Sequence, residues 1–572
     1  MAAASPPTST TDKDLASIAE ARALARRART AQALLGELSQ AQIDAIVDAM
    51  AAAVRPHAEA LARLAVEETG FGVVADKVQK NLFASDRVHA FIRPMKTVGV
   101  IARHEATKVV EIAEPFGVVA AIVPSTNPTS TAIYKILIAI KARCAIVISP
   151  HPSAARCITR VAEIMSEAAK AAGAPDGIIG WLTTVTLEGT QELMKQREIS
   201  VILATGGMGL VRAAYSAGKP AYGVGPGNAP CYVESSADLV KAANDIIAGK
   251  SFDNGVLCSS PNSVVVDEKV AAELKRHMEA AGGYFLSDAE AASLAAVLVT
   301  PQRLPNPVLV GKSAMHIAEK IGIRVPAGTR ALLATLTGVG RDYPLSIEKL
   351  CPVLSFYVVK DWREGCERCK EILRYGGMGH TMSIHSRDEA VILEFGLHKP
   401  AYRICVNTPT THGSVGMTTG LDPAMTLGCG GFGGNITSDN ISPKHLLNIK
   451  RLAYEIRPLT HQPAAPQPTA SATGSLSPAE PLRARVDRYL QGKGFPAAAP
   501  AVRPAAAPAA AALPSEAVEK PVAFVCEDDV RQALKAGRTI VVGDRTIVTP
   551  AARDLGDAEH VFRTAGVSTI RK

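Results

Sequence analysis

The chain has 572 residues, of which 47% are hydrophobic and 20% charged, and its formal net charge is +8. These values are typical of a globular protein and exclude a wholly disordered, collagen-like or membrane-embedded chain. No dense Lys/Arg run is present and aromatic residues make up only 4%, which argues against a nucleic-acid partner. The N-terminus has no apolar secretory segment and the 10 cysteines are scattered. We therefore expect a cytoplasmic protein with neither a membrane partner nor a metal site.

Helical and strand patterns alternate along most of the chain. Apolar residues recur at helical spacing within residues 14–66, which predicts antiparallel helices. Beyond residue 111, β-branched runs alternate with helical patterns, and a second such block begins near residue 262. The first block predicts strands at 118–123, 145–149 and 201–204, with helices at 129–142 and 154–172. The alternation indicates an α/β fold of two doubly wound domains, with a site in the crevice at the strand carboxyl ends.

The last 114 residues differ in composition, because they hold 12 of the 37 prolines. We interpret 459–475 as a linker and 494–522 as a flexible Pro/Ala-rich spacer. Between them, 476–493 predicts an amphipathic helix that starts with a capping box and carries one apolar stripe. Residues 523–572 predict a small module with a helix from 527 to Gly537. A β-hairpin is expected around the two-residue turn at 543–544.

Three turns in the sequence are candidate site segments. Cys258 follows a Gly-containing turn, where a cysteine can lie at the mouth of a cleft. Asn127 lies between a predicted strand and a predicted helix, where its amide could cap the helix or donate to a developing oxyanion. Residues 204–209 combine a strand end, a Gly-rich turn and a helix start, a pattern whose backbone N–H groups can bind phosphate.

Together these segments resemble the aldehyde dehydrogenase superfamily. Residues 114–130 look like its cofactor entry, Phe-Asp-Asn-Gly-Val-Leu-Cys at 252–258 is similar to its nucleophile segment, and Glu-Lys-Leu-Cys-Pro-Val at 348–353 resembles its Glu-x-x-x-Pro-Val segment. The CoA-acylating branch is the nearest match. Its typical segments are Ser-Pro-His-Pro at 149–152, Gly-Pro-Gly-Asn at 225–228, the glycines and asparagine at 427–435 and Pro-Lys-His-Leu at 443–446. The resemblance runs from about residue 15 to residue 458.

The resemblance implies roles for individual residues. Cys258 would be the nucleophile, and Asn127 with the Cys258 backbone N–H would stabilise the oxyanion. The cofactor NAD would be held by residues at strand ends and by a glutamate that orients the nicotinamide ribose. These cofactor-binding residues are Pro124, Ser125, Thr126, Ser149, His151, Pro152, Thr205, Gly206, Gly207, Gly225 and Glu348. His380 and His412 lie in Gly-rich stretches, where each could assist proton transfer or be a structural histidine.

Two departures from the hydrolytic branch favour acyl transfer. The segment that matches the water-activating glutamate of hydrolytic members is 222–228, which contains no carboxylate. The segment that matches their ribose-binding lysine is 149–152, which contains no lysine. The resemblance therefore implies that coenzyme A, as cosubstrate, accepts the acyl group. It also implies an NAD-binding and oligomerisation domain over 1–255, to which about 400–458 returns, a catalytic domain over 256–400, and a small β-hairpin oligomerisation extension.

The sequence thus predicts an NAD-dependent CoA-acylating aldehyde dehydrogenase, with propionaldehyde favoured as its short-chain substrate. A sulfoacetaldehyde-type acylating enzyme and a non-catalytic scaffold of the same fold are the alternatives. The 114 residues beyond 458 are too few for the alcohol dehydrogenase half of bifunctional relatives, and they resemble extensions of enzymes packed in bacterial microcompartments. We therefore expect a homo-oligomer, dimer or tetramer, in a microcompartment lumen. Its 476–493 helix would act as an encapsulation peptide that binds shell or cargo proteins.

Overall fold

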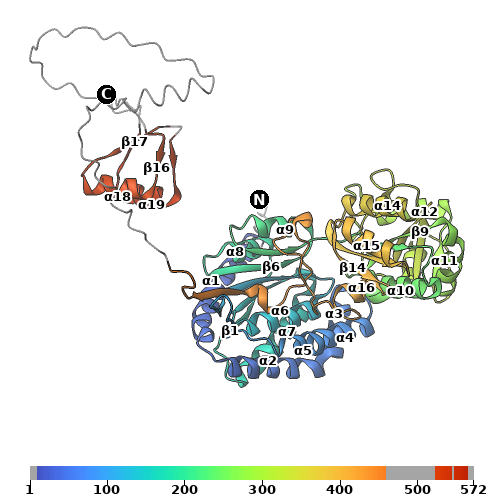
Figure 1. The fold of residues 1–572 in the computed structure, drawn as a ribbon, viewed down its shortest axis with the longest axis horizontal. Helices are drawn as coiled ribbons and strands as arrows, with labels where there is room; N and C mark the ends of the chain where they lie inside the picture. Colours follow the sequence, from blue (N-terminus) through green and yellow to red (C-terminus); the bar gives the residue numbers. More distant parts are fainter. Residues whose placement is uncertain (1–9, 459–521, 544–545, 565–572) are drawn as a thin grey trace, which may run out of the picture. The chain divides into compact units, whose positions relative to one another are not determined.

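The computed structural model describes residues 10–458, 522–543 and 546–564 (Figure 1). The chain forms two compact units, with the boundary in the sequence at residue 460, and each unit is described by itself. Three predicted segments lie outside the described residues: the linker at 459–475, the helix at 476–493 and, apart from residue 522, the spacer at 494–522. No helix in the described ranges has the length and apolar character needed to cross a membrane.

The chain starts with the helices that the apolar spacing predicts: α1 (Thr10–Gly36), α2 (Gln40–Val54) and α3 (Ala58–Thr69). A capping box between Ser39 and Gln42 starts α2, and Gly70 ends α3 in a left-handed conformation with φ of 69°. In the tertiary structure α1 packs on α8 (Leu187–Lys195) and α2 packs on α7 (Ala155–Ala171). Of these helices, α1, α7 and α8 also contact strands of the first sheet.

The first sheet has five parallel strands in the order β5-β4-β3-β6-β7. Its strands are β3 (Val118–Val123), β4 (Ile146–Pro150), β5 (Ile179–Trp181), β6 (Ile199–Thr205) and β7 (Ala221–Val224). Every residue of β3 and β4 is buried, as expected for central strands that are covered on both faces. The strand order reverses between β3 and β6, which opens a crevice at their carboxyl ends. Helices α6 (Pro128–Lys141) and α9 (Met208–Tyr215) start at this edge.

The second sheet has seven parallel strands in the order β10-β11-β12-β9-β8-β13-β14. Its strands are β8 (Ala229–Val233), β9 (Pro261–Asp267), β10 (Gly283–Phe285), β11 (Ala331–Thr335), β12 (Val353–Val359), β13 (Gly379–His385) and β14 (Ala401–Val406). Helices α10 (Leu239–Ser251) and α11 (Glu268–Ala280) pack on each other, and α14 (Trp362–Tyr375) packs on β8 and β9. The predicted pair of doubly wound α/β layers is therefore present.

The division between the two sheets differs from the predicted boundary at residue 255. β8 pairs with β9 and β13, so the chain passes from the first sheet to the second at residues 225–228. β14 likewise still belongs to the second sheet, so the return predicted at about residue 400 comes after Val406. Both differences have one physical cause, because a strand's sheet is set by hydrogen bonds to partners that are distant in the sequence.

A three-stranded antiparallel sheet corresponds to the expected hairpin extension. β1 (Gly99–His104) and β2 (Val109–Pro115) form the hairpin, and β15 (Leu447–Ala453) pairs with β2 from the far end of this unit. β15 is mostly exposed along its length. The extension therefore links the C-terminal end of the first unit to the hairpin at 99–115.

The second unit contains a small module with the helix predicted from residue 527, α18 (Glu527–Lys535). The hairpin expected around 543–544 is wrong. β17 (Ile540–Val542) pairs in parallel with β19 (Phe562–Thr564), and β18 (Ile547–Val548) pairs in parallel with β16 (Phe524–Val525). A helix follows each of β16 and β18, and α19 is the second of them (Pro550–Ala558). The intervening helices bring the strands into parallel pairs.

Candidate active site

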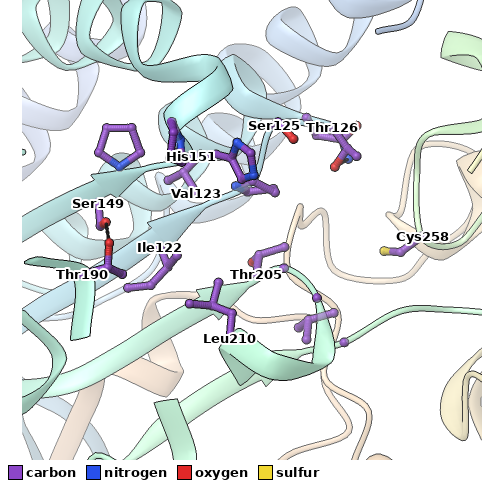
Figure 2. Close-up of a pocket in the computed structure, with 18 of the residues that line it drawn as sticks. Ile122, Val123, Ser125, Thr126, Ser149, His151, Thr190, Thr205, Leu210 and Cys258 are labelled. Carbon is purple, nitrogen blue, oxygen red and sulfur yellow. Dashed lines mark hydrogen bonds between the residues drawn. The ribbon is translucent and has the colours of Figure 1, made fainter. Parts of the chain in front are cut away.

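A cavity of about 430 Å³ opens at the carboxyl ends of β3, β4 and β6 and reaches the segment that carries Cys258 (Figure 2). Figure 2 shows Cys258 at one end of the view and the Ser149–Thr190 pair toward the other. All of the predicted site residues line this one cavity: Pro124, Ser125, Thr126, Asn127, Ser149, His151, Pro152, Thr205, Gly206, Gly207, Gly225, Cys258 and Glu348. The structure thus brings together residues from both sheets.

The turn after β3 holds Asn127 as the residue that precedes α6. Its side chain makes no helix-capping hydrogen bond, so the capping role that the sequence left open is not the one it has. Instead, Asn127 Oδ1 accepts a hydrogen bond of 2.6 Å from Lys80 Nζ. The amide Nδ2 donates to Thr126 Oγ1 at 3.2 Å. Because an amide nitrogen carries two N–H groups, a second donor remains for a ligand.

The turn after β6 presents groups suited to a nucleotide. Gly207 directly precedes α9, where the Leu210 and Val211 N–H groups donate to the Gly207 carbonyl while the Met208 and Gly209 N–H groups have no intrahelical acceptor by geometry. The hydroxyl of Thr205 is buried without a hydrogen-bond partner and lines the cavity. At the end of β4, Ser149 Oγ pairs with Thr190 Oγ1 at 2.8 Å. The unpaired Thr205 hydroxyl and the apolar walls from Val185, Leu187 and Leu210 are groups that fit a dinucleotide.

Cys258 lies between the short helix η4 (Phe252–Gly255) and β9, with its thiol half-buried. Burial raises the pKa of this thiol to about 12; the nearby Glu348 acts in the same direction, and Arg403 opposes the shift. The segment packs tightly against Gly227, where a Cβ atom would lie 2.1 Å from the Cys258 carbonyl oxygen. A glycine at 227 therefore permits the contact that places the cysteine.

Glu348 is the one carboxylate among the described residues that line the cavity. Its Oε1 accepts a hydrogen bond of 2.8 Å from the Gly227 N–H, so it also fixes the 225–228 crossing. Burial raises the pKa of Glu348 to about 8, while the Gly227 N–H and the Lys250 charge act against the shift. The segment 222–228 brings no carboxylate to the cavity, as its sequence predicts.

The two histidines that the sequence singled out differ in position. A Cβ atom on Gly227 would lie 3.3 Å from His380 Cδ2, so His380 adjoins the Cys258 segment. His380 Nε2 is buried without a partner, and burial lowers its pKa to about 3. His412 packs edge-on against Phe252 with ring centroids 4.5 Å apart, and it is not among the cavity-lining residues. Both histidines therefore adjoin the 252–258 segment with a buried ring nitrogen that has no hydrogen-bond partner, His380 Nε2 and His412 Nδ1, and neither is among the described residues that line the cavity.

Two features of the site were outside the sequence prediction. Lys80, which contacts Asn127, lies on α4 (Val74–Leu82) and is 2% exposed. Arg403 on β14 is 3% exposed and influences the Cys258 thiol. The sequence signal that could have indicated Lys80 is its spacing from Lys77, a Lys-x-x-Lys pair within a helical pattern. Lysines in such a pattern usually face solvent, so the signal is weak. Within the described ranges, no cluster of three or more His, Cys, Asp or Glu side chains is placed to hold a metal.

The sequence matches the family model "Aldehyde dehydrogenase family" over residues 6–288. It is 41% identical to the bifunctional aldehyde-alcohol dehydrogenase of Escherichia coli K12 over 441 residues, which are 76% of this chain and 49% of that protein. It is 38% identical to the acetylating succinate-semialdehyde dehydrogenase of Clostridium kluyveri, over 75% of this chain and 95% of that protein. The chain spans about half the length of the first curated relatives that it matches.

Solved structures share the architecture of the first unit. An acetylating aldehyde dehydrogenase from Geobacillus thermoglucosidasius superposes with a TM-score of 0.77 and 50% identity, over 78% of this chain and 98% of that one. A propionaldehyde dehydrogenase from a fucose utilisation microcompartment of Clostridium phytofermentans gives 0.68 and 29%, over 75% and 96%. A propionaldehyde dehydrogenase of Rhodopseudomonas palustris, solved with CoA and an acylated cysteine, gives 0.69 and 26%, over 76% and 97%.

Proposed function

Because this chain belongs to the aldehyde dehydrogenase family, we propose that it oxidises a short-chain aldehyde to an acyl-CoA, with NAD as the hydride acceptor. One observation carries the proposal. The cavity at the switch point of the first sheet collects a thiol, an amide donor and dinucleotide-type turns, and Glu348 is its one carboxylate among the described residues. The acylating activities of relatives and structural neighbours support the same reaction.

In this mechanism Cys258 loses its proton and its sulfur attacks the aldehyde carbon, which gives a thiohemiacetal on the enzyme. Asn127 Nδ2–H and the Cys258 backbone N–H stabilise the oxyanion that develops on the aldehyde oxygen. The Cys258 proton passes to solvent, because burial lowers the pKa of His380 to about 3 and makes its ring a weak base that stays neutral at physiological pH. These groups stay in place through both half-reactions.

NAD would be held by the strand-end turns of the first sheet. The Gly207 N–H group and the Thr205 hydroxyl would bind the phosphates, Gly206 would line the same turn with its N–H donating to the Val224 carbonyl, and Glu348 would orient the nicotinamide ribose. When bound, the nicotinamide supplies a hydride acceptor, so that an acyl thioester remains on Cys258. The walls of Val185, Leu187 and Leu210 would exclude water from the nucleotide end.

We expect acyl transfer to CoA because the described lining residues include no second carboxylate that could activate water. Glu348 is the one carboxylate among the described lining residues, so in its proposed ribose-binding role it leaves no separate carboxylate to activate water beside Cys258. Hydrolysis of the thioester is then slow, and the thiol of CoA takes the acyl group and regenerates Cys258. We propose that CoA enters the cavity after the reduced nucleotide leaves it.

An uncharged substrate such as propionaldehyde fits the site better than a sulfonated one. Arg403 is the cation that influences Cys258, but its guanidinium donates to the Ser438 carbonyl at 2.9 Å and to the Gly428 carbonyl at 2.5 Å. A guanidinium held by backbone carbonyls is not available to a sulfonate. The sulfoacetaldehyde alternative, although an acylating relative of that type is 39% identical, is therefore the weaker one.

We further propose a homo-oligomer that resides in a bacterial microcompartment and docks on shell or cargo proteins through residues 476–493. The Pro/Ala-rich composition around this segment supports the proposal, as does the microcompartment origin of one structural neighbour. The segment itself lies outside the described residues.

A single-turnover experiment tests the proposed chemistry. The protein is mixed with NAD and propionaldehyde without CoA, and NADH formation is followed together with the intact mass of the protein. We expect a burst of one NADH per active site and a propionyl adduct on the peptide that contains Cys258, which CoA then removes. A burst with no acyl adduct, or an adduct on another residue, would contradict the mechanism.

A further inference from the structure

Two lysines on α4 are buried around one aspartate. Lys77 is 1% exposed, Lys80 is 2% exposed, and Asp253 is fully buried. Lys77 Nζ lies 3.0 Å from Asp253 Oδ2, and Lys80 forms an ion pair with the same oxygen. Burying two ammonium groups is costly unless their hydrogen bonds are well satisfied. Such a cluster beside the active site therefore calls for a functional explanation.

The aspartate belongs to the segment that leads to the nucleophile. Asp253 lies in η4, five residues before Cys258, and has a left-handed backbone with φ of 49°. Its Oδ1 accepts from the Val73 N–H at 2.7 Å, and its own N–H donates to Asp76 Oδ2 at 2.7 Å. Gly72 permits this arrangement, since a Cβ there would lie 2.0 Å from Asp253 Oδ1. The start of α4 thus holds the nucleophile segment.

The lysines contact the turn that carries the oxyanion donor. Lys77 Nζ donates to the Thr126 carbonyl at 3.1 Å, and Lys80 Nζ donates to Asn127 Oδ1 at 2.6 Å. An ammonium group only donates, so it fixes which end of the Asn127 amide faces it. Oδ1 must face Lys80, and Nδ2 is then left for the cavity that Cys258 also lines.

We propose that Lys80 is a positioning residue that holds the Asn127 amide with its N–H group toward the reacting carbonyl. Asp253 holds Lys80 in turn, so that one buried network sets the oxyanion donor and the nucleophile segment relative to each other. The inference rests on the proposed function, because it assigns Lys80 a part in the same oxyanion stabilisation. The positive charge of Lys80, which lies beside Oδ1, also polarises the amide and strengthens Nδ2 as a donor.

The charge on Lys80 depends on its surroundings. Burial lowers the pKa of Lys80 to about 8; the neighbouring Lys77 adds to the shift, while Asp253 and Asp76 oppose it. A Lys80 that loses its proton as pH rises through this value loses its charge but keeps two N–H donors. The charge-dependent part of the acylation rate should therefore decline above pH 8 in wild type, and Lys80→Met should abolish that decline.

A double-mutant cycle on the full chain tests the proposal. The rate of the NADH burst is measured without CoA for wild type, Lys80→Met, Asn127→Ala and the double variant. Loss of an oxyanion donor costs about 10²–10³ in rate, so we expect Asn127→Ala to fall in that range and Lys80→Met to lose about tenfold or more. The double variant should be no slower than Asn127→Ala alone, because Lys80 acts through that amide.

Two controls separate positioning from a loss of structure. Lys141 is another buried lysine, whose ion pair at 2.5 Å is with Asp44 on α2, and it does not line the cavity. Lys141→Met should lower the melting temperature and leave the burst rate unchanged. Lys80→Arg keeps a charged donor and should restore part of the rate. Alkylation of Cys258 by iodoacetamide should proceed in Lys80→Met as in wild type.

The outcomes distinguish the two proposals. Additive losses in the cycle, or a Lys80→Met burst as fast as wild type, would overturn the positioning role while the proposed function stands. The positioning role would also be overturned if Lys80→Met slowed Cys258 alkylation by the same factor as the NADH burst. Lys80 would then support the nucleophile and not the Asn127 amide. A wild-type protein with no burst would refute the proposed function itself.

Discussion

Burial sets the protonation state of Cys258. Its pKa is raised to about 12, so the thiol, not the thiolate, dominates at neutral pH. The reactive thiolate is then a minor species whose fraction grows with pH. Arg403 limits the shift from its position on β14, since its charge favours the thiolate.

The rate of Cys258 alkylation by iodoacetamide should follow this titration. Below the pKa the thiolate fraction rises about tenfold per pH unit, so the rate should keep increasing from pH 6 to pH 10 without a plateau. Labelling is measured on the Cys258 peptide by mass spectrometry, with Cys258→Ala as the background for the other cysteines. A plateau below pH 8 would mean a thiolate that is already formed.

Single residues of the site differ in how far the sequence could predict them. Cys258, Asn127 and Glu348 lie in strand-end or loop segments with distinct motifs, and the structure collects all three at one cavity. Lys80 lies in no such motif, and its partner Asp253 is 173 residues away in the sequence. Contacts across that separation depend on the tertiary fold, and a lysine in a helical pattern reads as a solvent-facing residue.

Among the elements, the 225–228 crossing between the two sheets packs closely against the Cys258 segment. Gly227 N–H is held by Glu348, and its Cα faces the Cys258 carbonyl so closely that no side chain fits. The crossing thus connects the nucleophile with the carboxylate at the cavity. Any shift of this element moves both groups.

Gly227→Ala should therefore impair catalysis by displacing the Cys258 segment. A misplacement of about 1 Å can cost about 10²-fold, and we expect a fall of that order in kcat/KM for the aldehyde. Gly396, inside α15 (Glu389–His398), is a matched control, because nothing lies within 4 Å of an added Cβ. Gly396→Ala should raise the free energy of unfolding by about 1 kcal/mol with activity unchanged. Equal activity in the two variants would contradict the packing argument.

The elements also show where sequence patterns fail. The strands predicted at 118–123 and 201–204 are confirmed as β3 and β6, because buried β-branched runs between helical patterns have few other interpretations. The hairpin at 543–544 is wrong because a Gly-Asp turn motif was given more weight than the strand–helix alternation around it. That alternation, with α18 and α19 after β16 and β18, favours the parallel pairing that the structure has.

On the scale of the whole molecule, the cavity is built within the first unit. Its lining residues run from Ile122 to Leu350, and the unit ends at residue 460. The C-terminal module has a separate small core that includes Val525, Val530 and Val561. The described cavity-lining residues and the core of the C-terminal module therefore belong to different units of the chain.

Deletion of residues 459–572 should leave kcat and KM unchanged, because no cavity-lining residue is removed. If the tail docks on shell or cargo proteins, the same deletion should abolish co-sedimentation with purified shells. Both properties are measured on the full chain and on the truncated protein. Loss of activity with unchanged sedimentation would assign the tail to catalysis instead of docking.

The CoA dependence of steady-state turnover tests the central claim most directly. The protein is mixed with NAD and propionaldehyde, with and without CoA, and NADH formation is followed. The Cys258→Ala variant is measured in parallel. We predict continuous turnover only with CoA, and none in the variant. Continuous NADH formation without CoA, or turnover by Cys258→Ala, would contradict an acylating mechanism that runs through this cysteine.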